Sequence, residues 1–213
     1  MLYINRRTCG PMFGRTWATL SLSRESSTRG RCRTEENGRL WVFDQARLRW
    51  SSLEPADPGQ DVPEGRSYHA LANDGEGKLY LHAGCAPSGR LSDLWSFDLQ
   101  ERTWRRLHDT PGPARGGACL AFAPGKLWRM HGFDGTREQG LAVDVFDPAS
   151  GAWETRTWDA RSGPVPRSVR TLLPVRARSD DGEKEFLVTM FGERSRYSGA
   201  YRGWEDVGGC MNV

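Results

Sequence analysis

The sequence has no long hydrophobic run. No window comes near the ~20 consecutive apolar residues that a membrane-spanning helix needs, and the mean hydropathy is −0.66. The amino terminus also lacks the ~7–15-residue apolar core of a secretory signal. We therefore expect no membrane partner and a cytoplasmic location. Because residues 1–34 are rich in arginine and serine and hold a single acid, Glu25, a mitochondrial presequence is the alternative.

Cysteine pairs with metal-binding spacing are also missing. The chain has five cysteines, an odd number, with no Cys-x-x-Cys and no Cys/His ligand spacing: Cys9, Cys32, Cys85, Cys119 and Cys210. Structural zinc sites draw their ligands from closely spaced pairs of this kind. The scattered cysteines predict no zinc site, and they favour a reducing intracellular compartment.

A basic face is missing from most of the chain. The formal charge is +3, but residues 1–34 alone carry +6, which leaves −3 on the remainder. A nucleic-acid binder needs a basic surface over its folded part, so we expect no nucleic-acid partner. We interpret residues 1–36 as an irregular or disordered Arg/Ser-rich segment, residues 37–207 as the folded part and residues 208–213 as a tail.

Motifs of common catalytic sites are absent as well. There is no Gly-x-Ser-x-Gly, no P-loop and no Gly-x-Gly-x-x-Gly in the context of a strand followed by a helix. The 25 glycines, 12 prolines and 9 tryptophans instead describe a chain rich in turns and strands. An enzyme is therefore uncertain, and a binding protein is favoured.

What the sequence does contain is a repeat. Each unit begins with an arginine after a proline-bearing loop, continues with a strand that ends at a glycine, and closes with Phe-Asp and a tryptophan shortly after. The recurring residues are Arg66, Gly84, Phe97, Asp98 and Trp104 in one unit and Arg115, Gly132, Phe146, Asp147 and Trp153 in the next, with Arg167 and Gly192 in a partial third unit and Phe43, Asp44 and Trp50 in a partial earlier one.

The spacing of these residues is regular. Arg66 and Arg115 are 49 positions apart, Arg115 and Arg167 are 52 apart, and Gly84 and Gly132 are 48 apart. A period of ~50 residues with strand-like alternation is typical of a β-propeller in which each repeat is one four-stranded blade. The sequence therefore predicts an all-β fold built from such blades.

Each recurring residue has a physical role in that unit. An aspartate at the end of a strand, such as Asp98, opens a turn by accepting hydrogen bonds from backbone amides two residues ahead. The tryptophan that follows packs its large face between neighbouring blades. Gly84 and Gly132 let the second strand end in a conformation that a Cβ atom would forbid.

This pattern resembles the kelch family. In that family a Gly-Gly doublet ends the second strand, whereas here the doublet is degenerate: Gly84-Cys85, Gly132-Phe133 and Gly192-Glu193. The segments that begin at Arg66 and His82 are most similar to kelch proteins of fungal type, some of which resemble the plant nitrile-specifier and thiocyanate-forming proteins. The resemblance covers about residues 37–207. It implies a scaffold that binds protein partners through loops at one rim.

The units add up to an incomplete kelch-type propeller of about three to four four-stranded blades, whereas propellers close with ~4–8. Gly203 to Val207 predict the start of a further strand. Three explanations are open: a fragment or non-functional truncated gene product, a ring completed by a second copy, or a short open solenoid. Open blade edges favour self-association.

The repeated arginines are candidate binding residues. Arg66, Arg115 and Arg167 stand at the start of the first, innermost strand of each unit, so we expect them at the mouth of the central channel, with His69 close by. Guanidinium groups there would bind carboxylate or phosphate groups of a partner in a bidentate way. The alternative is that each arginine ties neighbouring loop carbonyls together.

Two pairs of titratable residues are interpreted as repeated structural positions. His82 and His131 occupy the same repeat position, immediately or nearly before the recurring glycine, and Asp93 and Asp144 match repeat positions in the third strand. Residues one blade apart do not converge on a shared site. We therefore predict no metal site from the histidines and no paired-carboxylate catalysis from the aspartates.

The likeness to nitrile-specifier proteins implies an iron-dependent lyase as the alternative function. Those proteins hold Fe2+ with Glu, Asp and His ligands in the loop after a blade's second strand. Glu193 is present in the matching region, Tyr197 stands where the His is expected, and no Asp lies between them. We therefore expect no cofactor, with Glu193 the remaining candidate ligand for iron. Galactose oxidase shares the propeller, but its copper ligands cannot be mapped onto this chain.

Overall fold

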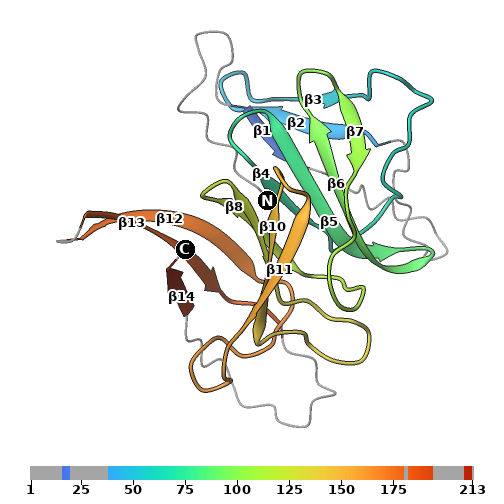
Figure 1. The fold of residues 1–213 in the computed structure, drawn as a ribbon. Coiled ribbons are helices and arrows are strands. Elements are labelled where there is room, and N and C mark those ends of the chain that lie inside the picture. Colours follow the sequence, from blue (N-terminus) through green and yellow to red (C-terminus); the bar gives the residue numbers. More distant parts are fainter. Residues whose placement is uncertain (1–15, 20–37, 180–181, 194–208, 213) are drawn as a thin grey trace.

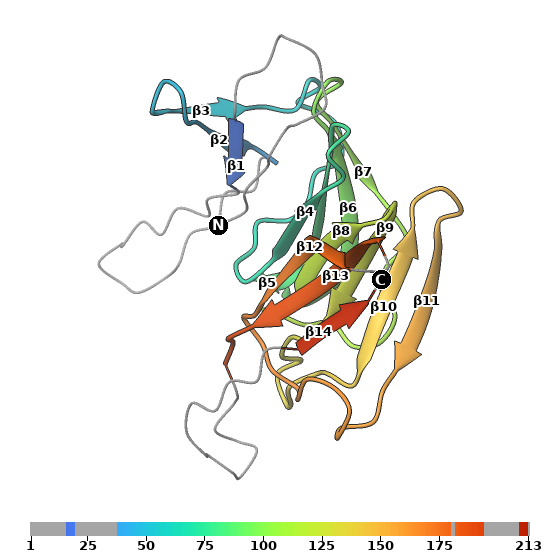
Figure 2. The same cartoon turned by 90° about the vertical axis from the view of Figure 1, so that its left-hand side faces the viewer.

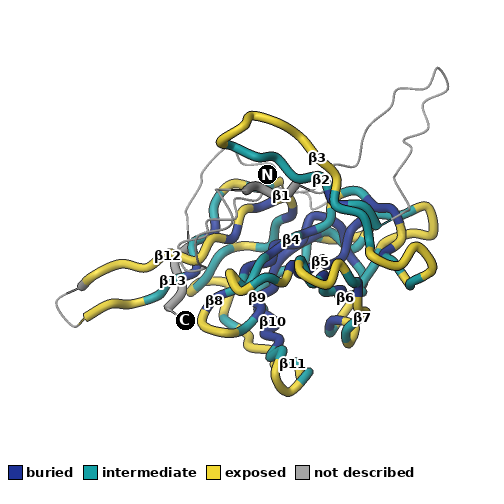
Figure 3. The backbone as a smooth tube through the Cα atoms, turned by 90° about the horizontal axis from the view of Figure 1, so that it is seen from above, coloured by how far each residue is buried: buried dark blue, intermediate teal, exposed yellow. Residues whose placement is uncertain are grey.

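A computed structural model describes residues 16–19, 38–179, 182–193 and 209–212 of the chain (Figure 1). These residues form strands and turns and no helix, so nothing in the described ranges is a helix that could cross a membrane. The strands build four antiparallel sheets that follow one another along the chain. The predicted all-β fold is confirmed. Figure 3 shows that the buried backbone lies along the strands, while most of the exposed backbone lies in the connections.

The second and third sheets are complete blades. Each has four strands that pair in sequence order, which is the unit that the repeat predicted. The second sheet is made of β4 (Ala70–Asn73), β5 (Lys78–Ala86), β6 (Gly89–Asp98) and β7 (Thr103–Arg106). The third sheet is made of β8 (Cys119–Ala123), β9 (Lys126–Met130), β10 (Ala142–Asp147) and β11 (Ala152–Thr157).

The first and fourth sheets have three described strands each. The first contains β1 (Thr16–Thr19), β2 (Leu40–Asp44) and β3 (Arg49–Leu53). The fourth contains β12 (Thr171–Ser179), β13 (Gly182–Met190) and β14 (Gly209–Asn212). Residues 203–207, where a further strand was predicted to start, lie outside the described residues.

Two of these strands form where the sequence predicted no regular structure. β1 lies within residues 1–36, and β14 lies within the 208–213 tail. Each adds to the edge of a sheet, β1 beside β2 and β14 beside β13. An edge strand offers backbone N–H and C=O groups to any chain that can lie alongside it. Pairing of this kind does not require the hydrophobic alternation from which the other strands were predicted.

The turn that joins the last two strands of a blade forms as predicted. The Oδ1 atoms of Asp44, Asp98 and Asp147 each accept a hydrogen bond at 2.9 Å from the backbone N–H two residues ahead. Because the carboxylate accepts a hydrogen bond from an amide within the turn, a short hairpin is favoured. This is why the Phe-Asp pair recurs at the same point of each unit.

The tryptophan of each unit packs beside the phenylalanine of the same hairpin. The ring centroids lie 4.9 Å apart for Phe97 and Trp104 and 5.0 Å apart for Phe146 and Trp153. The Trp104 indole N–H also donates to the backbone oxygen of Gly38 at 2.9 Å, across the junction with the first sheet. The predicted position of the tryptophan between blades is therefore confirmed at Trp104.

The core is divided into three clusters, one at each junction between consecutive sheets. Figure 2 shows the second sheet lying between the first and the third. Buried side chains join the first and second sheets at Leu40, Leu79, Leu81, Trp95, Phe97 and Trp104. They join the second and third at Ala70, Ala72, Tyr80, Leu94, Leu120, Leu127 and Phe146, and the third and fourth at residues that include Cys119, Trp128, Val145, Leu172 and Leu187. Each sheet is stabilised mainly by its neighbours along the chain, as in a propeller.

The segments that lead into the inner strands β4, β8 and β12 are also joined by backbone hydrogen bonds. Gly117 N–H donates to Tyr68 O, and Val169 N–H donates to Gly117 O, both at 2.8 Å. The repeated glycine donates to the arginine of the next unit, from Gly84, which lies inside β5, to Arg115 and from Gly132, just after β9, to Arg167. The same two bonds therefore repeat at both junctions between inner strands.

Candidate partner-binding rim

The two ends of the sheets differ in the length of their connections. At one end the strands are joined by short turns at residues 45–48, 74–77, 99–102, 124–125 and 148–151, which we call the short-turn rim. At the other end lie the longer segments 61–69, 111–118, 131–141 and 164–170 together with the two-residue turn 87–88, which we call the long-loop rim. Hydrogen bonds join its parts, from Ser88 Oγ to Glu64 Oε2 at 2.7 Å and from Ser168 Oγ to Glu138 Oε1 at 3.3 Å. Long loops held by a rigid scaffold are where binding surfaces concentrate.

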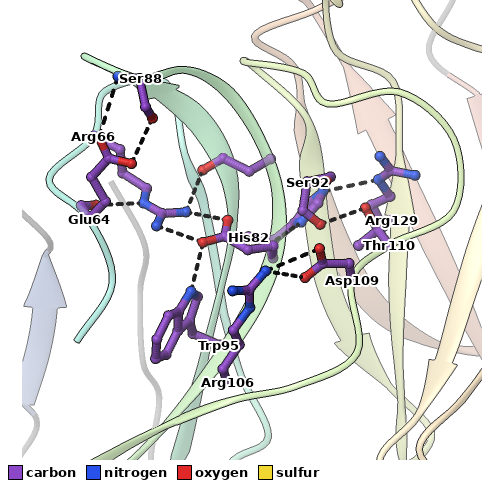
Figure 4. A network of polar contacts seen from close by, with 12 residues as sticks. Glu64, Arg66, His82, Ser88, Ser92, Trp95, Arg106, Asp109, Thr110 and Arg129 are labelled. Carbon is purple, nitrogen blue, oxygen red and sulfur yellow. Dashed lines mark hydrogen bonds and ion pairs between the residues drawn. The ribbon is translucent and has the colours of Figure 1, made fainter. Parts of the chain in front are cut away.

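Arg66 is buried at this rim and bonded on every side (Figure 4). Its guanidinium donates to the backbone oxygens of Glu64 at 2.9 Å and Ala83 at 3.2 Å. It also forms a bidentate ion pair with the two carboxylate oxygens of Asp93, at 2.5 and 2.8 Å. Asp93 in turn accepts a hydrogen bond from the Trp95 indole N–H at 2.7 Å. This geometry is that of a side chain that fixes loops in place.

Arg115 repeats the same contacts without the ion pair. Its guanidinium donates to the backbone oxygens of Pro113 and His131, both at 3.1 Å. Within the described part of the chain no carboxylate bonds to Arg115. Burial, and after it the nearby charge of Arg129, lowers the pKa of Arg115 to about 10. The arginine is therefore kept for its two carbonyl contacts at some electrostatic cost.

Arg167 and His69 complete the set of residues that the sequence predicted to bind a partner. Arg167 is half-buried, and its backbone oxygen accepts the Gly132 N–H at 2.9 Å. His69 is half-buried, and its Nδ1 has no hydrogen-bond partner among the described residues. Burial, and then the charge of Arg66, lowers the pKa of His69 to about 4, so the ring is neutral at pH 7. The four residues lie on one rim, and their contact with a partner stays a prediction.

A second buried ion pair was not predicted from the sequence. Arg129 on β9 pairs with Asp144 on β10, and the Asp144 carboxylate also accepts the Thr155 hydroxyl at 2.7 Å. The Arg129 guanidinium also contacts the preceding blade, where its Nε–H donates a hydrogen bond to His82 Nε2 at 3.0 Å. Burial, offset in part by Asp144, lowers the pKa of Arg129. The available signal was a charged residue inside the otherwise apolar run from Leu127 to Met130.

The strand register corrects the expected equivalence of the two histidines. His82 lies opposite Leu94 in the second sheet, whereas Met130, not His131, is the residue opposite Val143 in the third. His131 therefore corresponds to Ala83, one residue further on. Counted back from the glycine that ends the strand, the two histidines differ by one position. In a strand, a shift of one residue sends the side chain to the other face.

The aspartates are displaced from each other by two positions. Leu94 and Val143 are equivalent, so Asp93 precedes that position and Asp144 follows it. The expectation that they match in the repeat is wrong by this register. Each carboxylate meets a different arginine: Asp93 pairs with Arg66 and Asp144 with Arg129.

Three residues at equivalent positions on this rim adopt the left-handed backbone conformation. They are Tyr68 at φ 54°, Gly117 at φ 66° and Val169 at φ 54°. Only glycine adopts this region at little cost, and other residues lose roughly 1–2 kcal/mol there. Tyr68 nevertheless presents a side chain that is 63% exposed. The same rim carries Arg90 over the ring of Phe133, 5.1 Å from the centroid.

Glu193, the candidate iron ligand, is exposed. Its backbone pairs with Ser168 through hydrogen bonds of 2.7 and 2.9 Å. Tyr197, the residue expected at the histidine position, lies outside the described residues. In the ranges that are described, no group of three or more His, Cys, Asp or Glu side chains could hold a metal ion. The iron alternative stays a prediction that rests on Glu193 alone.

Comparison with protein families agrees with this architecture. A family model described as the KLHDC2/KLHL20/DRC7 Kelch-repeats domain matches residues 29–178, which is more than half of the chain. The match spans both complete blades and the strands β2 and β3 of the first sheet. Domains of this kind are typically protein-interaction modules. The chain belongs to the kelch-repeat family, and its described sheets are blades of a partial propeller.

Proposed function

We propose that this chain is a kelch-repeat interaction module that binds a partner protein on the long-loop rim, with Tyr68 as a central contact. The observation that carries the proposal is the combination of exposure and fixation at Tyr68. Its side chain is 63% exposed, while its backbone is held from both sides. Tyr68 O accepts the Gly117 N–H, and the preceding residue, Ser67, forms two backbone hydrogen bonds with Cys85, at 2.7 and 2.9 Å.

A tyrosine in this position suits protein recognition. It offers a large amphipathic surface with few rotatable bonds, and tyrosine is enriched among the residues that dominate binding energy. The left-handed backbone costs roughly 1–2 kcal/mol that glycine would avoid. Strain of this kind is concentrated at functional sites. We infer that the side chain is kept for a contact outside the chain.

The recurring arginines fix the backbone of this surface through buried hydrogen bonds. Arg66 ties Glu64, Ala83 and Asp93 together directly before the Ser67–Tyr68 segment. A rigid loop loses less conformational entropy on binding than a free one. In this proposal Arg66 and Arg115 act by positioning the rim, and the exposed side chains supply the contact.

The test replaces Tyr68 with glycine and compares it with a matched control. Leu48 also has a left-handed backbone, φ 50°, and is 75% exposed, but it lies on the short-turn rim. Both Tyr68→Gly and Leu48→Gly relieve strain and remove an exposed side chain, so both should keep or raise the melting temperature. The wild type and Leu48→Gly should capture the same partner proteins from a cell extract. The amount captured by Tyr68→Gly should be at least tenfold lower, as for a binding hot spot of about 2 kcal/mol. Equal capture by all three chains would contradict the proposal.

A further inference from the structure

One face of the fourth sheet is apolar and partly exposed. The side chains of β12 alternate between the two faces of the sheet, and Leu172 is buried against the third sheet. Leu173 and Val175 therefore point away from it and are 44% and 39% exposed. Their partners across the β12–β13 ladder are Val188 and Phe186. We call Leu173, Val175, Phe186 and Val188 the trailing face.

The same face is covered in the two complete blades. Leu173 opposite Val188 corresponds to Ala121 opposite Trp128 in the third sheet, because both pairs lie two residues along from the start of the first strand. Ala121 is 3% exposed, against 44% for Leu173. Ala121 and Trp128 belong to the cluster that packs against the fourth sheet. The trailing face is therefore the continuation of an interface that already exists inside the chain.

The opposite end of the chain carries the complementary face. On the second sheet, Trp95, Phe97 and Trp104 are buried against the first sheet. Their counterparts on the first sheet are Trp41, Phe43 and Trp50, which we call the leading face. Phe43 and Trp50 pack with ring centroids 5.0 Å apart, as Phe97 and Trp104 do at 4.9 Å.

The leading face differs from its counterpart in exposure. Trp50 is 53% exposed, whereas Trp104 is 7% exposed because the first sheet covers it. Among the described residues, no core cluster joins the first sheet to the fourth. Each end of the sheet array therefore presents one half of the blade-to-blade junction.

We propose that a second copy of this chain fills these half-junctions, with the trailing face of each copy against the leading face of the other. The interaction is head-to-tail, since two different surfaces meet. The described residues of one copy form four sheets, so two copies supply eight. Propellers close with ~4–8 blades, and a head-to-tail contact that closes gives a ring instead of an open filament. The expected assembly is a closed dimer.

The first measurement is the solution mass of the full chain by light scattering after size exclusion. The wild type should have a solution mass of twice 23.9 kDa. Leu173→Lys blocks the trailing face and Trp50→Lys blocks the leading face, because each places a charge in an apolar junction. Each variant alone should be a monomer. Leu48→Lys, which changes an exposed residue outside both faces, should keep the dimer mass.

The decisive measurement mixes the two blocked variants. Leu173→Lys retains an intact leading face and Trp50→Lys an intact trailing face, so the mixture should form a 1:1 dimer through one junction. A wild type that stays monomeric up to its solubility limit, or a mixture that stays monomeric, overturns the proposal. Tryptophan fluorescence melts check that each variant folds. If Leu173→Lys does not fold, Val175→Lys tests the same face.

Discussion

In the two complete blades, equivalent arginines bind equivalent backbone oxygens but have different charged neighbours. Arg66 and Arg115 stand at the same position of the repeat and donate to equivalent backbone oxygens. Arg66 also meets the Asp93 carboxylate, whereas no described carboxylate bonds to Arg115. Removing one partner of a buried ion pair leaves an uncompensated charge, while removing a buried charge that has no counter-ion does not. The two arginines should therefore differ in their contribution to stability.

The third sheet places its ion pair elsewhere. Arg129 and Asp144 lie in the middle of adjacent strands, and Arg129 extends to His82 on the preceding blade. The second sheet has Leu81 and Trp95 at the equivalent positions, both in an apolar cluster. The repeat therefore preserves the hydrogen bonds between inner strands and varies the buried charges. Backbone contacts define the blade, and the buried charges are specific to each junction.

The largest expected effect is that of Arg66→Met. The substitution leaves Asp93 without its counter-ion at a largely buried position, so we expect the free energy of unfolding to fall by about 3–5 kcal/mol. For a chain of this size that corresponds to a decrease of about 10 °C in melting temperature. Denaturant unfolding followed by tryptophan fluorescence measures it.

A double variant separates the lost charge partner from lost packing. Arg66→Met combined with Asp93→Leu removes both charges, and it should recover at least half of the lost stability because an apolar pair can replace a buried ion pair at little net cost. If the double variant is as unstable as Arg66→Met alone, the uncompensated carboxylate is not the cause.

The second effect, about 3 kcal/mol, is a loss of stability in acid that depends on His131. Burial, and after it the charges of Arg170, Arg115 and Arg167, lowers the pKa of His131 from 6.5 to about 4. Between pH 6.5 and pH 4 the unfolded chain therefore binds a proton that the folded chain does not. The stabilising contribution is complete above pH 6.5 and decreases as the pH falls towards 4.

The variant His131→Ala tests this contribution. Alanine is the residue that the second sheet carries at the equivalent position, Ala83, with a similar backbone φ of 59°. We expect the variant to lose less stability than the wild type between pH 6.5 and pH 4. Some pH dependence should remain, because burial also lowers the pKa values of His69 and His82. An unchanged pH profile would show that His131 is solvated.

The smallest effect expected in this comparison is that of Arg115→Met, about 1–2 kcal/mol. The substitution removes two hydrogen bonds, to Pro113 O and His131 O, but no ion pair. Measured under the same conditions as Arg66→Met, it should be at least twofold less destabilising. Equal losses for the two variants would mean that the carbonyl contacts, and not the Asp93 pair, account for the stability at both positions.

Much of the blade could be predicted because its determinants are local. Asp98 and Asp147 act on amides two residues away, and Gly84 and Gly132 meet a steric requirement at a single point of the chain. A Cβ atom on Gly84 would lie 2.7 Å from the backbone oxygen of Ser67. Such requirements recur with every repeat and can be read at regular spacing.

The candidate site was predicted less completely. The position of Arg66 and Arg115 on one rim followed from the repeat, but their burial did not, because burial depends on which side chains close over them. Asp93 and Asp144 show the same limit. The two carboxylates lie two positions apart in the register and meet different arginines, and the spacing of the repeat does not fix the register with this precision.

By itself the sequence determined the family, the all-β architecture and the repeated hairpins, since these depend on turn chemistry and on hydrophobic alternation within one unit. Only the tertiary structure decided the ion pairs and the exposed faces. Arg66 meets Asp93 across 27 positions, and Arg129 meets His82 across 47. The exposure of Leu173 depends on whether another sheet packs against it, and no such sheet is among the described residues. Contacts between blades depend on the register and on the neighbouring sheet, and neither is encoded in any single repeat.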